Sequence, residues 1–373
     1  MRTWPIKKLG EVIEISYGKG LPKDSRIDSG KYFAYGSNGP VYSTDESLTN
    51  GETIVIGRKG TAGALYFISD PCWPIDTTFF AKPKNDVSLK FIYYLLRTKR
   101  LPSLAIVTGV PGINRTTLAN INVQLPPLTT QRQIVERLDK IAEAQKLNDG
   151  LIQKADELFQ SLLHKEFHPV RDSKNSNGVN PDGKDWEIKK LGDIAETSSG
   201  GTPLKEKSEF YENGTIPWLR SGEVSQGLIY KSELCITEKG LKQSSAKIFP
   251  IDTVLVAMYG ATAGKIGLLK FEASTNQAIC GIFPNKKFIS EYLYYFLKTK
   301  TEYLIQISTG GAQPNISQTV IRNLKIPLPP LEVQKQIAAK LSAVQDYKKQ
   351  LIAKRTKLKE LFDSVLHKSM KNE

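Results

Sequence analysis

Residues 125–165 begin with Leu125-Pro126-Pro127-Leu128 and end with Leu-His-Lys, and residues 328–368 begin and end with the same letters. The two stretches align without a gap at an offset of 203 residues, so that Gln131, for example, matches Gln334. Because no insertion interrupts the alignment, we expect both copies to share one geometry. The rest of the chain is organised around this repeated stretch.

Each copy predicts one long helix. Neither copy contains a proline after its opening pair, and a proline would break a helix interior. The apolar residues are spaced alternately by four and three, which is the period of a coiled coil. The predicted pairing seam is Ile134, Leu138, Ile141, Ile152, Ala155, Phe159 and Leu162 in the first copy and Ile337, Leu341, Val344, Leu351, Leu358, Phe362 and Val365 in the second. Its polar members are Gln145, Asn148, Lys348 and Arg355.

A helix of this length needs a partner. About 35 residues at 1.5 Å per residue form a rod of roughly 50 Å. The duplication favours the other copy as the partner, antiparallel across a pseudo-two-fold axis, over a helix that packs only on its own domain. Thr130 and Gln133 fit a capping box at the start of the first helix. Gly150 weakens that helix by roughly 1 kcal/mol relative to alanine.

The duplication extends to the whole chain. The pattern Trp-x-Ile-Lys-Lys-Leu-Gly begins at Trp4 and again at Trp186, which is typical of tandem repeats. We therefore predict a first domain at residues 1–124 and a long helix at 125–167. A linker rich in Ser, Asn, Asp, Gly and Pro follows at 168–185 and is expected to be flexible. The second domain is predicted at 186–327, and the second long helix at 328–373.

Each domain is expected to mix short strands with one short helix. In the first, a buried strand at 53–56 precedes a glycine-rich loop at 57–63, a helix at 88–99, a polar loop at 108–115 and a strand at 119–125. In the second, a strand at 252–258 precedes a glycine-rich loop at 259–265, a helix at 290–300 and a polar loop at 309–315. Tyr93, Tyr94, Tyr294 and Tyr295 are expected to pack these helices rather than to stack on bases.

The composition favours an acidic partner. The 373 residues carry 52 Lys+Arg against 38 Asp+Glu, a net charge of +14, and the usual partner of such a chain is nucleic acid. The three cysteines, Cys72, Cys235 and Cys280, are far apart and predict neither a disulfide framework nor a metal site. The sequence shows no signal core and no apolar run of about 18 residues, so we expect a cytosolic chain.

The sequence offers little for catalysis. The loop from Gly260 to Lys265 resembles a phosphate-binding loop, but Ile266 stands where Ser or Thr should hold magnesium. Pro181-Asp182 and Glu187-Ile188-Lys189 resemble a nuclease pattern, but they span the predicted linker instead of two strands. The Asn-Pro-Pro-aromatic site of amino-methyltransferases is missing. No acid, base or nucleophile constellation recurs in both copies, so the sequence predicts no catalytic residue.

Polar and basic residues do recur on the predicted loops. Arg, Lys, Asn and Gln pair with base edges, and Lys, Ser, Thr and loop amides contact phosphates. Each of these residues alone is expected to be an exposed polar turn, but their joint placement in both copies favours DNA. The candidates are Lys19, Lys23, Ser37, Asn38, Arg58, Lys59, Thr61, Asn114 and Arg115 in the first domain and Lys205, Arg220, Ser221, Tyr259, Thr262, Lys265, Asn276, Gln277, Gln313 and Asn315 in the second.

In combination, these motifs resemble the specificity subunit of Type I restriction-modification systems. The resemblance rests on the repeated Trp-x-Ile-Lys-Lys-Leu-Gly opening, the two glycine loops, Ser274-Thr275-Asn276-Gln277-Ala278, and Leu-Pro-Pro-Leu-x-x-Gln-x-Gln-Ile before each long helix. It covers essentially the whole chain. The first loop, Gly57 to Gly63, departs from the Tyr-Gly-Ala form of the second, so family motifs carry over to it less firmly.

The resemblance implies an α+β fold in which two pseudo-repeated α/β target-recognition domains are separated by two long antiparallel helices. It implies that each domain reads one half of a bipartite, asymmetric DNA site, and that the helices set the gap. It further implies docking of two modification subunits that methylate adenine with S-adenosylmethionine, and of restriction subunits. The chain itself then needs no cofactor, and ATP and Mg²⁺ belong to partner subunits.

Two other classes of protein stay open at this stage. One is a catalytic chain, a fused methyltransferase or nuclease, and the other is a coiled-coil adaptor without a DNA role. Methylation by the isolated chain would indicate the first, and binding that is insensitive to salt and DNA competitors would indicate the second.

Overall fold

The computed structural model describes residues 4–84, 86–107, 109–167, 186–308 and 315–371. The chain forms two compact units: the first contains residues up to 150 together with those from 351 onward, and the second contains residues 151–350. Each unit therefore takes one part of each long helix, whereas the boundaries expected from the sequence kept each helix whole. The predicted linker, 168–185, lies outside the described residues.

The first unit contains a four-stranded antiparallel sheet in the order β2-β8-β5-β6. A smaller sheet, β4-β3-β7, pairs β3 with β7 in parallel. The strands of the first unit are β1 (Ile6–Lys8), β2 (Ile13–Tyr17), β3 (Tyr32–Gly36), β4 (Gly39–Thr44), β5 (Thr53–Gly57), β6 (Leu65–Ile68), β7 (Trp73–Pro74), β8 (Thr78–Pro83) and β9 (Asn122–Gln124). Its short helices are α1 (Leu9–Val12), η1 (Lys23–Ser25), α2 (Leu89–Arg97), η2 (Leu101–Leu104) and α3 (Arg115–Ala119).

The second unit repeats this frame and extends it. Its main sheet has the order β11-β19-β16-β17-β13, and its smaller sheet has the order β14-β12-β18-β15. The strands are β10 (Glu187–Lys190), β11 (Thr197–Ser199), β12 (Ile216–Leu219), β13 (Leu228–Ile229), β14 (Leu234–Ile236), β15 (Ile248–Phe249), β16 (Val254–Ala257), β17 (Ile266–Leu269), β18 (Ala273–Thr275), β19 (Ile279–Ile282) and β20 (Lys325–Leu328). The short helices are α5 (Leu191–Ile194), η3 (Ser208–Phe210), η4 (Ser221–Gln226), α6 (Glu238–Lys242), η5 (Gly260–Thr262), α7 (Ser290–Thr299), α8 (Thr301–Gln306) and α9 (Gln318–Arg322).

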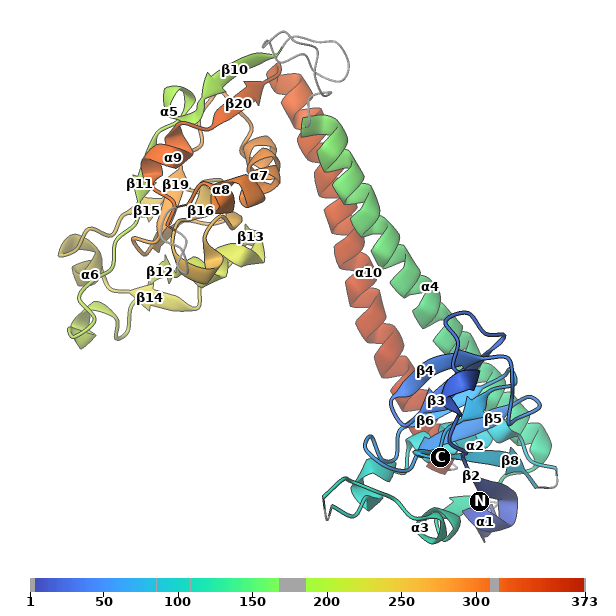
Figure 1. Ribbon diagram of the computed structural model, residues 1–373. Helices are drawn as coiled ribbons and strands as arrows, with labels where there is room; N and C mark the ends of the chain where they lie inside the picture. The colour runs from blue at the N-terminus through green and yellow to red at the C-terminus, as the bar shows by residue number, and fades with distance from the viewer. Residues whose placement is uncertain (1–3, 85, 108, 168–185, 309–314, 372–373) are drawn as a thin grey trace. The chain divides into compact units, whose positions relative to one another are not determined.

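The repeated Trp-x-Ile-Lys-Lys opening forms an edge strand in each unit. β1 pairs antiparallel with β9, and β10 pairs antiparallel with β20, beside which it lies in Figure 1. Both partner strands come directly before a long helix, so the opening motif holds the chain at the helix entrance. The strand predicted at 119–125 is wrong at its start, because residues 115–119 form α3 and β9 begins at Asn122.

The two long helices are α4 (Leu128–Phe167) and α10 (Leu331–Lys371). The predicted capping box is wrong, because α4 begins at Leu128 and Thr130 already lies inside it. The carbonyl of Pro127 accepts a 3.0 Å hydrogen bond from the Gln131 amide at this end. The Pro-Pro pair thus ends the preceding strand and leads directly into the helix.

A buried glutamine ties each helix start to the neighbouring short helix. Gln131 is 3% exposed; its Oε1 accepts from the Ser88 amide at 2.9 Å, and its Nε2 donates to the Pro126 carbonyl at 2.9 Å. Gln334 is 1% exposed and makes the same two bonds, with the Ile289 amide and the Pro329 carbonyl. Since an unpaired buried polar group is unfavourable, this bonding explains why both copies of the motif carry glutamine here.

Within the first unit, α4 and α10 run antiparallel. Gln145 Nε2 donates to the Leu358 carbonyl at 3.1 Å, and Asn148 Nδ2 donates to the Leu351 carbonyl at 2.9 Å. Ascending residues of one helix therefore meet descending residues of the other. Leu351 is also the repeat equivalent of Asn148, at the offset of 203 residues.

Within the second unit, the same antiparallel order holds. Lys340 forms a 3.3 Å ion pair with Glu166, and Lys348 forms one with Asp156. The predicted helix pair is confirmed, and each helix also packs on the domain cores, which was not predicted for both domains from the sequence. Phe362 lies in the core of the first unit, and Phe159 lies in the core of the second.

Most residues of the predicted seam are shielded from solvent. Ile134, Leu138, Ala155, Phe159, Ile337, Leu341, Leu351 and Phe362 are buried, and Ile141, Ile152, Leu162, Val344, Leu358 and Val365 are half-buried. Arg355 is wrong as a seam member because it is exposed. At the C-terminal ends of the two helices, the heptad pattern also missed the buried residues Leu163, Phe167, Leu366 and Met370. At these ends each helix contacts a domain core as well as the other helix, so residues on more than one face of the helix are buried.

The aromatic residues of the short helices are packing residues, as predicted. Tyr94, Tyr294 and Tyr295 are at most 4% exposed, and Tyr93 is partly buried against the first core. Burial and the hydrogen bond to Asp139 raise the pKa of Tyr94. All three cysteines are free; Cys72 and Cys280 are buried, and Cys235 is intermediate.

Candidate nucleic-acid interface

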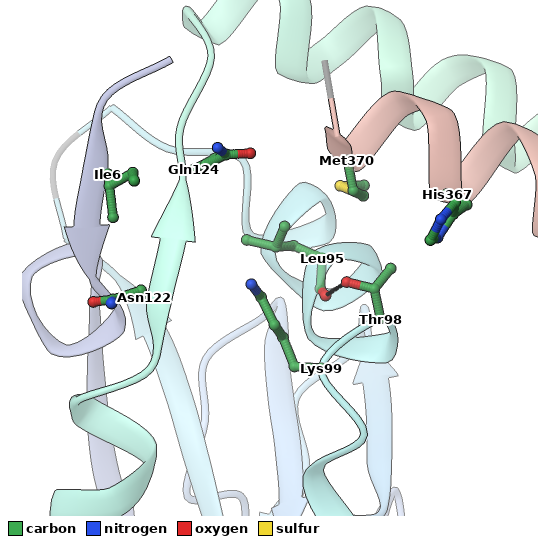
Figure 2. Close-up of a pocket in the computed structure, with 8 residues that line it drawn as sticks. All are labelled: Ile6, Leu95, Thr98, Lys99, Asn122, Gln124, His367 and Met370. Atoms are coloured by element: carbon green, nitrogen blue, oxygen red, sulfur yellow. Dashed lines mark hydrogen bonds between the residues drawn. The ribbon is translucent and has the colours of Figure 1, made fainter. Parts of the chain in front are cut away.

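The first unit contains a cavity of about 380 Å³ where β1, β9, α2 and the end of α10 meet. Its lining mixes apolar side chains such as Leu95 and Met370 with Lys99, Asn122 and His367 (Figure 2). The dashed bond in the figure, from Thr98 Oγ1 to the Leu95 carbonyl, measures 2.7 Å and ends the helix α2. This lining brings no acid, base and nucleophile together, so the cavity does not suggest catalysis.

Two further properties bear on the class of protein. Within the described residues, no group of three His, Cys, Asp or Glu side chains is placed to hold a metal ion. None of the described helices is long and apolar enough to cross a membrane. The candidate residues lie on the loops that the duplication repeats.

The glycine loop of the first unit follows β5 and is held by neighbouring backbone. The amides of Arg58 and Lys59 donate to the Thr77 carbonyl at 2.9 and 3.1 Å. The Arg58 carbonyl accepts from the Ile113 amide at 3.0 Å, and Gly60 donates to Pro111 at 3.0 Å. Residues 111–113, which belong to the predicted polar loop, are thereby fastened onto the glycine loop.

Two glycines of this loop take a backbone conformation that favours glycine. Gly60 and Gly63 have φ of 80° and 82°, and Gly260 and Gly264 of the second unit have 70° and 78°. A Cβ atom on Gly63 would also lie 2.6 Å from the Leu101 carbonyl carbon. The repeated glycines therefore build the turn, and the side chains between them are free to differ.

Tyr17 is the centre of the charged cluster in the first unit. The guanidinium carbon of Arg58 lies 5.3 Å from the centre of the Tyr17 ring, and that of Arg115 lies 5.4 Å from it. Tyr17 is 48% exposed at the end of β2 and packs on the buried ring of Phe79 at 5.0 Å. Neither arginine forms an ion pair with a described residue. This leaves two unneutralised cations on one accessible ring.

Other candidates lie around this cluster. Lys19 follows Tyr17 by two residues and is exposed, and its amide donates to the Pro74 carbonyl at 3.0 Å. Ser37 and Asn38 form the turn between β3 and β4, and a Cβ on Gly60 would lie 3.4 Å from Ser37 Oγ. Lys59 and Thr61 are exposed on the glycine loop. Asn114 is also exposed, but its side chain accepts from the Thr117 amide at 2.7 Å and caps α3.

The second unit repeats the backbone of this site with other side chains. The Met258 amide donates to the Ala278 carbonyl at 2.8 Å, and its carbonyl accepts from the Ile316 amide at 2.9 Å. These are the bonds that Arg58 makes in the first unit, so Met258 is its equivalent. Tyr259 then forms a bridge with Asn315, as Lys59 does with Gly112. Tyr259 and Asn315 are exposed, as expected for candidate contacts.

Lys265 has no counterpart lysine in the first unit. Gly264 donates to the Ala257 carbonyl as Gly63 does to Gly57, which aligns Lys265 with Ala64. Lys265 is exposed, and its amide donates to the Thr262 carbonyl at 3.0 Å. Burial lowers the pKa of Lys298, and the nearby charges of Lys348 and Lys265 lower it further. These lysines thus gather positive charge beside the loop.

A second group of candidates surrounds the end of β18. The Asn276 amide donates to the Leu219 carbonyl at 2.9 Å, which places Asn276 beside Arg220 and Ser221. Asn276 Oδ1 accepts from the Ala278 amide at 3.2 Å, and Gln277 accepts a hydrogen bond from the Thr202 hydroxyl. Arg220 Nη2 donates to Glu233 at 3.0 Å, so this arginine is already paired with a carboxylate.

Some candidates are not connected to either cluster. Lys23 in η1 and Lys205 before η3 are exposed, and no contact recorded among the described residues joins them to the loops. Gln313 lies outside the described residues. Sequence reasoning missed Tyr17 and Thr202; Tyr17 had a signal, because it ends the alternation begun by Ile13 and Ile15 just before a glycine.

Known proteins resemble the chain in sequence and in fold. The family model for the Type I restriction modification DNA specificity domain matches residues 1–157 and 183–361. The MjaIX specificity subunit of a Methanocaldococcus jannaschii Type I restriction enzyme is 36% identical over 51% of this chain and 44% of its own length. The EcoR124I/EcoR124II specificity subunit of Escherichia coli is 26% identical over 78% of this chain and 76% of its own.

Among solved structures, the crystal structure of a Type-I restriction-modification S subunit from M. genitalium covers 98% of this chain and 96% of that one. The TM-score is 0.68 at 18% sequence identity, so this likeness concerns the fold. Two α/β units with repeated loops and long shared helices define a duplicated two-unit chain. The chain belongs to the Type I restriction modification DNA specificity family. This membership confirms the resemblance found in the sequence, and the relatives named above are specificity subunits of Type I restriction enzymes.

Proposed function

We propose that this chain recognises a bipartite, asymmetric DNA site, with one half-sequence contacted by each unit. The observation that carries the proposal is the repeated loop with exchanged side chains. The backbone bonds at Arg58 recur at Met258, yet one position carries a cation and the other a buried apolar residue. Two loops with the same backbone bonds but different side chains favour two half-sequences that differ.

The charge of the loops supports DNA as the ligand. Lys19, Arg58, Lys59 and Arg115 form no ion pair with a described residue of their unit, and the whole chain carries a net charge of +14. Uncompensated cations next to glycine-loop amides suit phosphate contacts, and arginine suits base edges. A DNA ligand also agrees with action in the cytoplasm, the compartment expected from the sequence.

Selection of bound sequences from a random DNA pool tests the proposal. We expect two enriched half-sequences at a fixed gap, and an affinity for the selected site that falls steeply with salt because phosphate neutralisation releases counterions. Enrichment of no sequence, or binding that is insensitive to salt, would contradict it and favour an adaptor without a DNA role.

We further propose that the helices set the gap between the half-sequences. Both α4 and α10 continue from one unit into the other. Deleting residues 146–152 together with their equivalents 349–355 removes one heptad from each helix, about 10 Å of length. We expect the selected gap to change by about three base pairs while both half-sequences persist, because base pairs stack every 3.4 Å. An unchanged gap would contradict the proposal that the helices set the distance between the half-sequences.

We also propose that the helices dock two modification subunits. Leu158 and Leu361 are equivalents in the repeat, and they are 50% and 49% exposed. Two copies of one exposed apolar position suit two copies of one partner. S-adenosylmethionine, ATP and Mg²⁺ then belong to the modification and restriction subunits.

Co-purification tests this docking. With modification subunits co-expressed, Leu158→Glu and Leu361→Glu are each expected to leave one bound copy, and the double variant none. Retention of both copies by the double variant would exclude these positions. Gln153→Glu changes the charge of α4 at another exposed position and serves as the control.

A further inference from the structure

The cluster of Tyr17, Arg58 and Arg115 is built asymmetrically. Arg58 is half-buried, and its guanidinium also lies 6.0 Å from the centre of the buried Phe79 ring. Arg115 is exposed and touches the Tyr17 ring alone. Cation–π contact with two rings holds Arg58 more firmly than Arg115. The two arginines therefore differ in how far their geometry is fixed before a ligand arrives.

The donors of Arg58 are divided between the interior and the solvent. Its Nε atom is buried and has no hydrogen-bond partner. Its two Nη atoms bond no described residue and, unlike Nε, are not fully buried. The backbone beneath is fixed by bonds to Thr77 and Ile113. The result is a fork of N–H donors that is oriented in advance and lacks an acceptor.

We propose that Arg58 reads a guanine of the first half-sequence in the major groove, with its Nη donors on O6 and N7. This inference rests on the proposed DNA-binding function. Guanine is the base edge that offers two acceptors to an arginine fork. A fork that is already positioned loses little entropy on binding, which suits discrimination between bases. Tyr17 is the positioning residue, because the Arg58 guanidinium packs on its ring.

Arg115 has a different role in this arrangement. Its guanidinium is exposed at the first residue of α3 and has no second ring to fix its direction. A loosely held cation beside the reading fork suits a phosphate, which needs charge rather than a fixed orientation. Arg115 is therefore assigned to the backbone of the same half-site, and it neutralises charge without reading sequence.

The second unit cannot read a guanine in the same way. Met258 occupies the equivalent position and is 2% exposed, with its side chain in the core of that unit. The guanine contact is therefore a property of the first half-sequence alone. Because the second half-sequence does not depend on Arg58, it serves as an internal control for folding and for DNA binding.

Selection from a random DNA pool by the full chain and its variants tests the inference. The variants are Arg58→Ala, Arg58→Lys, Tyr17→Ala and Arg115→Ala, and Arg132→Ala, an exposed arginine of α4, controls for lost charge. In the wild-type motif, one position of the first half-sequence should be a guanine. With Arg58→Ala and Arg58→Lys, discrimination at that position should fall about 10- to 100-fold, while the second half-sequence stays unchanged.

Tyr17→Ala should relax the same position, and Arg115→Ala should weaken binding to all selected sites equally and reduce its salt dependence. An unchanged motif for Arg58→Ala, with weaker binding at every site, would assign Arg58 to a phosphate and overturn the inference while leaving the proposed function intact. Failure of the wild-type chain to enrich any motif would overturn both.

Discussion

An arginine follows the central strand of the first unit, and a methionine follows that of the second. Arg58 and Met258 make the same pair of backbone hydrogen bonds. The Arg58 guanidinium nevertheless reaches the accessible ring of Tyr17, whereas the Met258 side chain lies in the core of the second unit. Backbone amides and carbonyls of almost any residue can maintain this frame. The fold is therefore held by backbone bonds that do not depend on side-chain identity, which leaves the contact residues free to diverge.

The largest effects are expected where each unit depends on the helix of the other repeat. Phe362 of α10 is 3% exposed and packs on Tyr94 at 5.9 Å, whereas Phe159 of α4 packs on Tyr295 at 5.9 Å. Truncating either to alanine should destabilise the protein by about 3–5 kcal/mol. Hydrogen exchange should show protection lost first in β5 for Phe362→Ala and first in β16 for Phe159→Ala.

The exposed Leu147, on α4, provides the matched control. Leu147→Ala should change the free energy of unfolding by less than about 0.5 kcal/mol. If Phe362→Ala instead exposed β16 before β5, the assignment of the end of α10 to the first unit would be wrong.

The buried glutamines should behave alike in the two units. Gln131→Ala leaves the Ser88 amide and the Pro126 carbonyl without their partner, and Gln334→Ala does the same to Ile289 and Pro329. Each change should destabilise by about 1–3 kcal/mol, measured by urea unfolding. Gln133→Ala and Gln336→Ala, at exposed repeat positions, should have almost no effect. Markedly unequal effects of the two buried substitutions would show that the helix entrances are not equivalent.

The parts of the fold that the sequence predicted are those with a period or a repeat. The four-three spacing predicted that Ile134, Leu138 and Phe362 belong to the helix seam, and the repeated opening predicted the duplication. That this opening forms a strand in each unit was not predicted. The burial of Leu366 could not be predicted this way, because it depends on a domain packed beside the helix end. The role of Tyr17 likewise depends on Arg58 and Arg115, which are distant in sequence and meet only in the folded unit.

The lysine of the second loop should contribute affinity rather than sequence. Lys265→Ala removes one exposed cation where the first unit has Ala64. Loss of one phosphate contact should lower the slope of log affinity against log salt by about 0.9, with the selected half-sequences unchanged. The same change should raise the pKa of Lys298, because Lys265 is one of the charges that lower it.

Fluorescence anisotropy over a salt series measures this slope. Lys286→Ala, at another exposed lysine of the second unit, controls for net charge and should leave the slope nearly unchanged. A relaxed base preference for Lys265→Ala would instead show that this lysine contacts a base. The glycine loops of both units would then contribute to sequence recognition.

The smallest effect is expected at Gly150, where one long helix carries glycine and the other carries alanine. Its repeat equivalent is Ala353, and a Cβ on Gly150 would meet no atom within 4 Å. Gly150→Ala should therefore stabilise the protein by about 0.5–1 kcal/mol, since glycine has more freedom to lose in a helix. Urea unfolding should show a higher midpoint at an unchanged slope. If the stabilised variant also bound DNA less tightly, the glycine would be needed for bending of α4 on the DNA. Unchanged DNA binding would mean that the difference between Gly150 and Ala353 has no part in recognition.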